Sequence, residues 1–217
     1  MRIGVFDSGV GGLSVAWAIQ KAFPEHTVDY ASDTKNVPYG DKTPEEMVRV
    51  SLEVLRPLAE HSDVIVIACN SLTTNGIEML RKEISVPLIG IEPMVEAASL
   101  RTKTGVIAIC ATPATLKSER YNFLKDHYAT AMRVLEPDCS RWARMIESNT
   151  FEHEEIERQV NDMCGQGADV IVLGCTHYHW IEQAVLEAAD GRAIVLQPEA
   201  AVVKQLWALL AELARPA

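Results

Sequence analysis

The chain has 217 residues, enough for one domain or two small ones, and it carries a formal net charge of −10. Its 48% hydrophobic and 23% charged residues are typical of a globular protein, and the absence of any basic run argues against nucleic acid or an anionic membrane surface as a partner. Five cysteines without framework spacing, no visible signal peptide and no apolar run of about 20 residues lead us to expect a cytoplasmic protein.

Eight apolar, β-branched segments alternate with helical patterns along the chain. The segments predicted as strands are 2–6, 26–31, 63–68, 86–90, 105–110, 131–135, 169–174 and 193–197. The predicted helices are 13–20, 44–58, 77–84, 116–124, 142–147, 154–163, 182–189 and 200–213, with a further one after 93. Pro57 is expected to kink or end its helix near the last turn. The alternation predicts an α/β protein with parallel sheets flanked by helices.

These elements form two similar halves with no Gly-, Pro- or Ser-rich linker between them. We expect residues 1–93 and 198–217 to form an N-terminal lobe closed by a C-terminal helix, and residues 94–197 to form a second lobe. Because ligands of open α/β sheets bind outside the carboxyl ends of the strands, the expected active site is the cleft between the lobes.

Two of the predicted strands lie in segments of nearly identical sequence, DVIVIACN over 63–70 and DVIVLGCT over 169–176. Each copy ends in a cysteine, Cys69 or Cys175, followed by small polar residues and then a helical pattern. A buried cysteine often serves only as a small hydrophobe. The repeated context favours a functional pair instead, with both thiols at strand ends and one substrate held between them.

The first strand is followed by the glycine-rich stretch 7–12. Its glycines allow a tight turn and a close approach to a ligand, and a helix N-terminus offers free N–H groups to an anion. The spacing is not the G-x-G-x-x-G of a dinucleotide loop, and a phosphatase-type nucleophile at Asp7 has little support. The simplest interpretation is a strand-to-helix turn with Asp7 as a cap.

Three chemistries fit two such cysteines. A redox pair usually has the spacing C-x-x-C, which is absent here. A zinc site could use Cys175, His177 and His179, but their alternation is that of a strand and lacks the usual paired cysteines. The third chemistry is proton transfer at one carbon from opposite faces, which needs a base on one side and an acid on the other.

Thiols in that role need activating neighbours, because a free thiol has a pKa of about 8.5. The titratable candidates near the two strand ends are Asp7, His177 and Glu147. Hydroxyl and amide groups that could grip an amino acid's carboxylates are those of Ser8, Asn70, Ser71, Thr112, Thr115 and Thr176.

Several motifs together resemble one known family. They are DSGVGGLSV at 7–15, PYG at 38–40, ACN at 68–70 and GCTHY at 174–178, with GIEP at 90–93 and ATPAT at 111–115 as further matches. In this order, and over residues 3 to about 180, they are similar to the glutamate racemases, which are cofactor-independent amino-acid racemases. The resemblance implies a two-lobe α/β fold, racemisation of glutamate and a supply of D-glutamate for peptidoglycan synthesis.

The resemblance also implies residue roles. Cys69 and Cys175 would be the acid/base thiols, with Asp7 assisting the first and His177 with Glu147 assisting the second. The residues implied at the glutamate site are Asp7, Ser8, Tyr39, Gly40, Asn70, Ser71, Thr112, Thr115, Thr176 and His177. Neither pyridoxal phosphate nor a metal is expected, the expected partner is a small amino acid, and a homodimer is one expected assembly.

The chain departs from the family pattern at several positions. Ser71 replaces a threonine, Thr73 lies in a changed stretch after it, Ser148 replaces a glycine and His179 replaces a proline. The stretch 197–199, Gln-Pro-Glu, lacks an Asp-Ser pair. Two alternatives therefore stay open: a racemase or isomerase of another acidic amino acid such as aspartate, and a non-catalytic amino-acid-binding protein.

Overall fold

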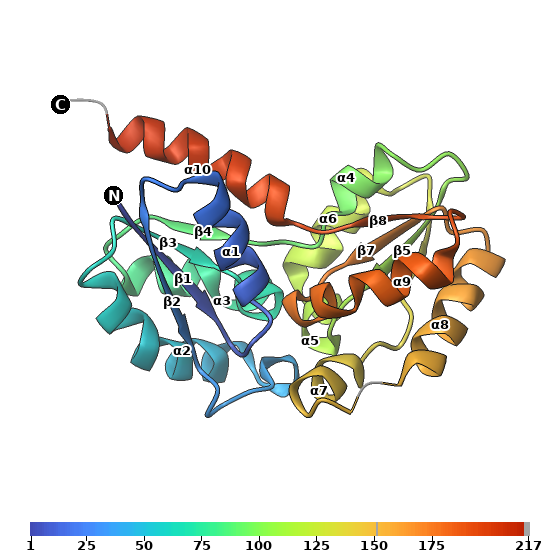
Figure 1. Ribbon diagram of the computed structural model, residues 1–217, viewed down its shortest axis with the longest axis horizontal. Coiled ribbons are helices and arrows are strands. Elements are labelled where there is room, and N and C mark those ends of the chain that lie inside the picture. Colours follow the sequence, from blue (N-terminus) through green and yellow to red (C-terminus); the bar gives the residue numbers. More distant parts are fainter. Residues whose placement is uncertain (151, 215–217) are drawn as a thin grey trace.

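The computed structural model describes residues 1–150 and 152–214, which form two four-stranded parallel sheets flanked by helices (Figure 1). The first sheet has the order β2-β1-β3-β4, and its strands are β1 (Arg2–Asp7), β2 (Thr27–Ser32), β3 (Val64–Ile67) and β4 (Leu88–Gly90). The second has the order β6-β5-β7-β8, and its strands are β5 (Val106–Cys110), β6 (Arg133–Leu135), β7 (Val170–Leu173) and β8 (Ile194–Leu196). The predicted α/β class with parallel sheets is confirmed.

The shared strand order makes the two duplicated strands equivalent. β3 pairs with β1, with Val66 opposite Val5, and β7 pairs with β5, with Val172 opposite Ile109. Every residue of β3 and of β7 is buried, because helices cover both faces of each sheet. The carboxyl ends of β3 and β7 therefore present corresponding points of the two halves.

Four α-helices cover the first sheet: α1 (Leu13–Ala22), α2 (Pro44–Ala59), α3 (Asn70–Glu83) and α10 (Glu199–Leu213). One face packs against α1 and α10, and the other packs against α2 and α3. We call this sheet with its helices, and with the short 3₁₀ helix η1 (Tyr39–Asp41), the first lobe. Figure 1 shows α10 leaving the second sheet and lying over α1.

The second lobe is the second sheet with its own helices. These are α4 (Val95–Ser99), α5 (Pro113–Lys117), α6 (Glu119–Tyr128), α7 (Trp142–Glu147), α8 (His153–Gly165), η2 (Thr176–Ile181) and α9 (Glu182–Ala189). One face of the sheet packs against α4 and α6, and the other against α7, α8 and α9. The lobe boundaries 1–93 with 198–217, and 94–197, stay a prediction; residues 151 and 215–217 lie outside the described part of the chain.

Three local predictions need correction or refinement. α3 begins at Asn70, seven residues before the predicted start, because the polar residues after Cys69 are already helical. The helix expected over 116–124 is two helices that meet at Ser118, whose hydroxyl accepts a hydrogen bond from the Tyr121 amide and so caps the second one. The strand-like alternation after Cys175 is misleading, since η2 there is a 3₁₀ helix.

The start of α2 follows simple rules. α2 begins with Pro44 in its first turn and with the Thr43 hydroxyl accepting a hydrogen bond from the Glu46 amide. It ends at Ala59, close to Pro57, as expected. Within the described residues, no helix combines the length and the apolar character that crossing a membrane requires.

Candidate active site

The two cysteines of the duplicated strands line one cavity. Cys69 directly precedes α3 and Cys175 directly precedes η2, and both are almost fully buried. The cavity contains residues of both lobes; those among the predicted site residues are Ser8, Tyr39, Gly40, Cys69, Asn70, Ser71, Thr112, Cys175, Thr176 and His177. Asp7, Thr115 and Glu147 stand behind this lining, in contact with it.

The cavity is small, at about 30 Å³. It lies where the two lobes meet, at the carboxyl ends of β3 and β7.

Asp7 and Ser8 surround Cys69. The Ser8 Oγ lies 3.4 Å from the Cys69 Sγ. Burial, together with the nearby charge of Asp7, raises the pKa of Cys69 to about 12, so the resting group is a thiol. Asp7 accepts hydrogen bonds from the Gly12 amide at 2.7 Å and from the Thr176 hydroxyl at 3.4 Å, and burial raises its own pKa. Asp7 thus caps the turn before α1, as the simplest interpretation predicts, and it also reaches the second lobe.

Cys175 has a different set of neighbours. His177 places Nδ1 3.7 Å from the Cys175 Sγ and Nε2 2.6 Å from Oε1 of Glu147, which also accepts a hydrogen bond from the Val10 amide. Burial alone would lower the pKa of His177, but the hydrogen bonds to Cys175 and Glu147 outweigh it and raise that pKa well above the usual range. The His177 hydrogen bond, in turn, lowers the pKa of Glu147. The result is a relay from carboxylate to imidazole to sulfur that can move a proton.

Hydroxyl groups from both lobes meet on another side of the cavity. The Ser71 Oγ lies 2.8 Å from the Thr112 Oγ1 and 3.4 Å from the Thr115 Oγ1, and the two threonine hydroxyls are 3.1 Å apart. Ser71, one of the departures from the family pattern, therefore keeps its hydroxyl in this cluster.

Asn70 is buried beside Cys69, and neither its amide oxygen nor its amide nitrogen has a hydrogen-bond partner among the described residues. A buried amide without partners is costly, so a polar ligand in the cavity would satisfy it.

The sequence reasoning missed three charged groups at the site. Asp33 accepts a hydrogen bond of 2.7 Å from the Tyr39 hydroxyl, and burial raises the pKa of Tyr39. The signal for Asp33 was its place directly after β2, where polar side chains of such sheets gather. Arg144 and Asp41 also line the cavity and form an ion pair between the lobes, which no sequence pattern predicted.

The other departures lie outside the cavity lining. The Ser148 hydroxyl donates to the Arg144 carbonyl at the end of α7, and Thr73 donates to the Ile67 carbonyl under β3. His179 contacts Ser14 and Glu199 rather than joining Cys175 and His177. Among the described residues, no group of three or more histidine, cysteine or acidic side chains is arranged to hold a metal ion.

The glycine-rich turn serves close packing between the lobes. A Cβ atom on Gly11 would lie 2.5 Å from the His177 amide nitrogen and 2.7 Å from the Thr176 carbonyl carbon, and one on Gly9 would overlap the Glu147 carboxylate. No real side chain tolerates such distances to backbone atoms, so the turn is built to approach η2.

Gly11→Ala should therefore push η2 away from the first lobe. We expect kcat/KM to fall by about 100-fold, the loss that a misplacement of about 1 Å can cause. Steady-state kinetics beside thermal unfolding would measure it. Gly165→Ala is the matched control, because nothing lies within 4 Å of a Cβ there. Equal activities of the two variants would contradict this account of the turn.

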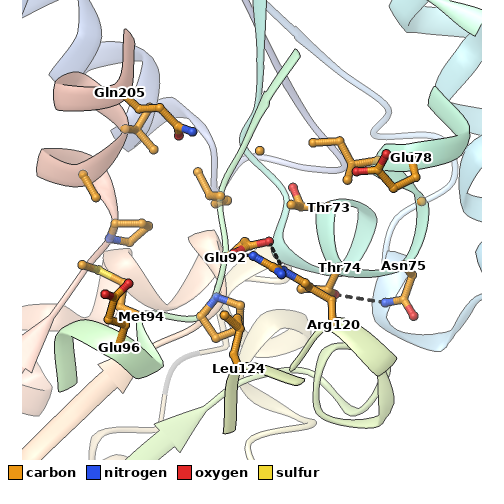
Figure 2. Close-up of a pocket in the computed structure, with 18 of the residues that line it drawn as sticks. Thr73, Thr74, Asn75, Glu78, Glu92, Met94, Glu96, Arg120, Leu124 and Gln205 are labelled. Atoms are coloured by element: carbon orange, nitrogen blue, oxygen red, sulfur yellow. Dashed lines mark hydrogen bonds and ion pairs between the residues drawn. The ribbon is translucent and has the colours of Figure 1, made fainter. Parts of the chain in front are cut away.

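A second and larger cavity, of about 800 Å³, lies between α3, the segment that links the lobes, α6 and α10 (Figure 2). Within it Arg120 is paired with Glu92 through two hydrogen bonds of 2.6 and 2.9 Å. The described residues that line it include no cysteine and no histidine. Among the described residues, the two predicted thiols and the predicted histidine therefore line the smaller cavity and not this one.

Two lobes of one topology, each supplying a thiol and its titratable neighbours to a shared cavity, define a class of two-lobe α/β proteins with acid and base groups in the cleft. Residues 14–206 match the Asp/Glu/Hydantoin racemase family, and the chain belongs to that family. The resemblance noted in the sequence is confirmed, and so is the prediction of an amino-acid racemase.

Named relatives agree with this assignment. A glutamate racemase of Herpetosiphon aurantiacus is 37% identical over 96% of this chain and 84% of its own length, and one of Stutzerimonas stutzeri is 36% identical over 97% and 82%. The crystal structure of Escherichia coli glutamate racemase, in complex with L-glutamate and the activator UDP-MurNAc-Ala, has a TM-score of 0.89 at 26% identity, over 97% of this chain and 82% of that one. An aspartate racemase of Picrophilus torridus, with a TM-score of 0.69 at 18% identity over 97% and 94%, shares the fold.

Proposed function

We propose that this protein interconverts L- and D-glutamate by proton transfer between Cys69 and Cys175. One sulfur, as thiolate, removes the proton from the α carbon, and the other, as thiol, returns a proton to the opposite face of the resulting carbanion. The two sulfurs exchange roles in the reverse reaction. The observation that carries the proposal is that equivalent strands of two lobes bring both thiols to one cavity.

The neighbours of each thiol support this role. The raised pKa of Cys69 suits a proton donor, and its carboxylate neighbour Asp7 can help it to lose the proton when it acts as a base. The His177–Glu147 pair can accept or return the proton of Cys175. All the groups needed belong to the chain itself, so the proposed reaction uses no cofactor.

Glutamate is the proposed substrate because the curated relatives with 34–37% identity are glutamate racemases. The cavity also offers polar groups that suit two carboxylates and an amine. They include the hydroxyls of Ser71 and Thr112 and the amide of Asn70, which has no partner in the part of the chain that the structure describes. D-Glutamate formed in this way would supply peptidoglycan synthesis. Cytoplasmic placement and assembly as a homodimer stay predictions.

Exchange of the α proton in deuterated water tests the substrate directly. We expect both enantiomers of glutamate to gain deuterium and to racemise, while L- and D-aspartate do so at least about 100-fold more slowly, because a pocket built to bind one length of side chain leaves polar groups unpaired with another. Proton NMR of the α position and polarimetry would follow the two events. Exchange with aspartate alone would identify the other acidic substrate, and no exchange despite binding would identify a non-catalytic protein.

A further inference from the structure

Three polar side chains outside the proposed proton path meet where the lobes touch. His179 of η2 places Nδ1 2.7 Å from Oε1 of Glu199, the first residue of α10, and 2.9 Å from the hydroxyl of Ser14 on α1. Ser14 and Glu199 are themselves 3.2 Å apart. The His179 side chain is only 2% exposed, so these contacts are shielded from water. We call these residues the Ser14–His179–Glu199 cluster.

The contacts of His179 define the hydrogen-bonding role of its Nδ1 atom. An ionised carboxylate only accepts hydrogen bonds, so Nδ1 of His179 carries a hydrogen and donates it to Glu199. Nε2 of His179 is buried and has no partner among the described residues. Burial raises the pKa of Glu199, but the contact with His179 and the hydrogen bonds from its own backbone amide and from Ser14 together outweigh it, so the net effect is a lowered pKa. The Glu199 carboxylate thus fixes the orientation of the imidazole ring.

The cluster is one contact in a continuous line along α1. Gly11, just before α1, lies against the backbone of His177, and Ser14 contacts His179 one turn later. One further turn on, the ring of Trp17 meets that of Trp180 edge to face, with centroids 5.7 Å apart. The first lobe therefore holds η2 at three successive points.

We propose that His179, held by Ser14 and Glu199, is a positioning residue for racemisation, which rests on the proposed function above. It fixes η2 against α1, and η2 carries His177 and begins directly after Cys175. None of the three cluster residues lines the cavity, so the effect passes through η2 alone. η2 follows Cys175 directly and carries its partner His177, whereas it reaches the surroundings of Cys69 only through the 3.4 Å contact of Thr176 with Asp7. Losing the cluster therefore slows the transfers made by Cys175 more than those made by Cys69.

His179→Ala and His179→Asn test the proposal together. The asparagine amide can replace the Nδ1 donor, whereas alanine removes it. We expect kcat/KM to fall about tenfold in the alanine variant, and to stay within about threefold of the wild type in the asparagine variant. His26→Ala is the matched control, because His26 pairs with Glu25 on the first lobe, away from η2.

Isotope effects provide the decisive measurement, with glutamate deuterated at the α carbon in each configuration. In His179→Ala the isotope effect should rise for the enantiomer that Cys175 deprotonates and fall for the other. A general loss of stability would lower both rates without this asymmetry. Equal isotope effects in the two directions, or unchanged activity, would overturn the proposal.

A second measurement does not depend on turnover. The Trp17–Trp180 pair should give an exciton signal in circular dichroism, which Trp17→Phe abolishes and which identifies the seated η2. We expect His179→Ala to weaken this signal and His26→Ala to keep it; an unchanged signal in His179→Ala would count against the inference. If the wild type fails to racemise glutamate but the signal responds as expected, the proposed function falls and the seating of η2 by the cluster stands.

Discussion

Cys69→Ser and Cys175→Ser should each abolish racemisation, with a loss of kcat of at least about 1,000-fold. A serine hydroxyl keeps nearly the same shape, but it holds its proton far more tightly than a thiol does, so it can neither remove nor exchange the α proton at useful rates. Both substitutions should matter equally because each direction of the reaction uses one sulfur as base and the other as acid. Chiral chromatography of glutamate after long incubation would measure the residual rate.

Cys164→Ser is the control for these variants, since Cys164 lies on α8 and is part-exposed, away from the cavity. It should keep wild-type kcat and KM. Near-normal turnover in either Cys69→Ser or Cys175→Ser would remove that sulfur from the mechanism, whatever the result for the other.

His177→Asn should lower kcat by about 100-fold, because Cys175 then loses the imidazole that exchanges its proton. Glu147→Gln should cause a smaller loss and should move the pH dependence. The hydrogen bond to Glu147 helps to raise the pKa of His177, so removing the carboxylate lowers that pKa, and the limb of the kcat/KM profile that reports His177 should shift to lower pH.

The same contact predicts how stability depends on pH. Because the pKa of His177 is higher in the folded protein than in the unfolded chain, its contribution to stability is complete below the unfolded value of about 6.5 and is lost as the pH rises through the folded value. Unfolding by urea across this range should show the decline in the wild type and a smaller one in Glu147→Gln. His127→Asn, on α6 in the second lobe, is the control that should change neither profile.

Much of the fold could be predicted because its strands have a clear sequence pattern. Runs such as that of β3 are β-branched, apolar and buried on both faces, and few other structures accept them. The start of α3 was missed because Asn70 and Ser71 are weak helix formers that face the cavity instead of the core. η2 was missed because its alternating cysteine and histidines imitate the period of a strand.

The site residues also fall into those that the sequence could predict and those that it could not. The two cysteines could be predicted from their repeated context, whereas Glu147 lies outside that context and was only one of several titratable candidates. Asp33 was missed because its partner Tyr39 follows within one polar loop that gave no pattern, and the Arg144–Asp41 pair was missed because it joins two distant segments. The Ser14–His179–Glu199 cluster could not be predicted at all. No sequence motif links its three residues, and only the folded chain brings them together.

The position of α10 has a consequence for biosynthesis. Val202, Leu206 and Leu210 complete the face of the first sheet formed by Ile3 and Val64, yet they follow the whole second lobe in the sequence. During translation the amino-terminal half therefore emerges with part of its apolar surface uncovered, while the second half is already complete in the nascent polypeptide. The first lobe should therefore complete its core only after the residues of the second lobe have been synthesised.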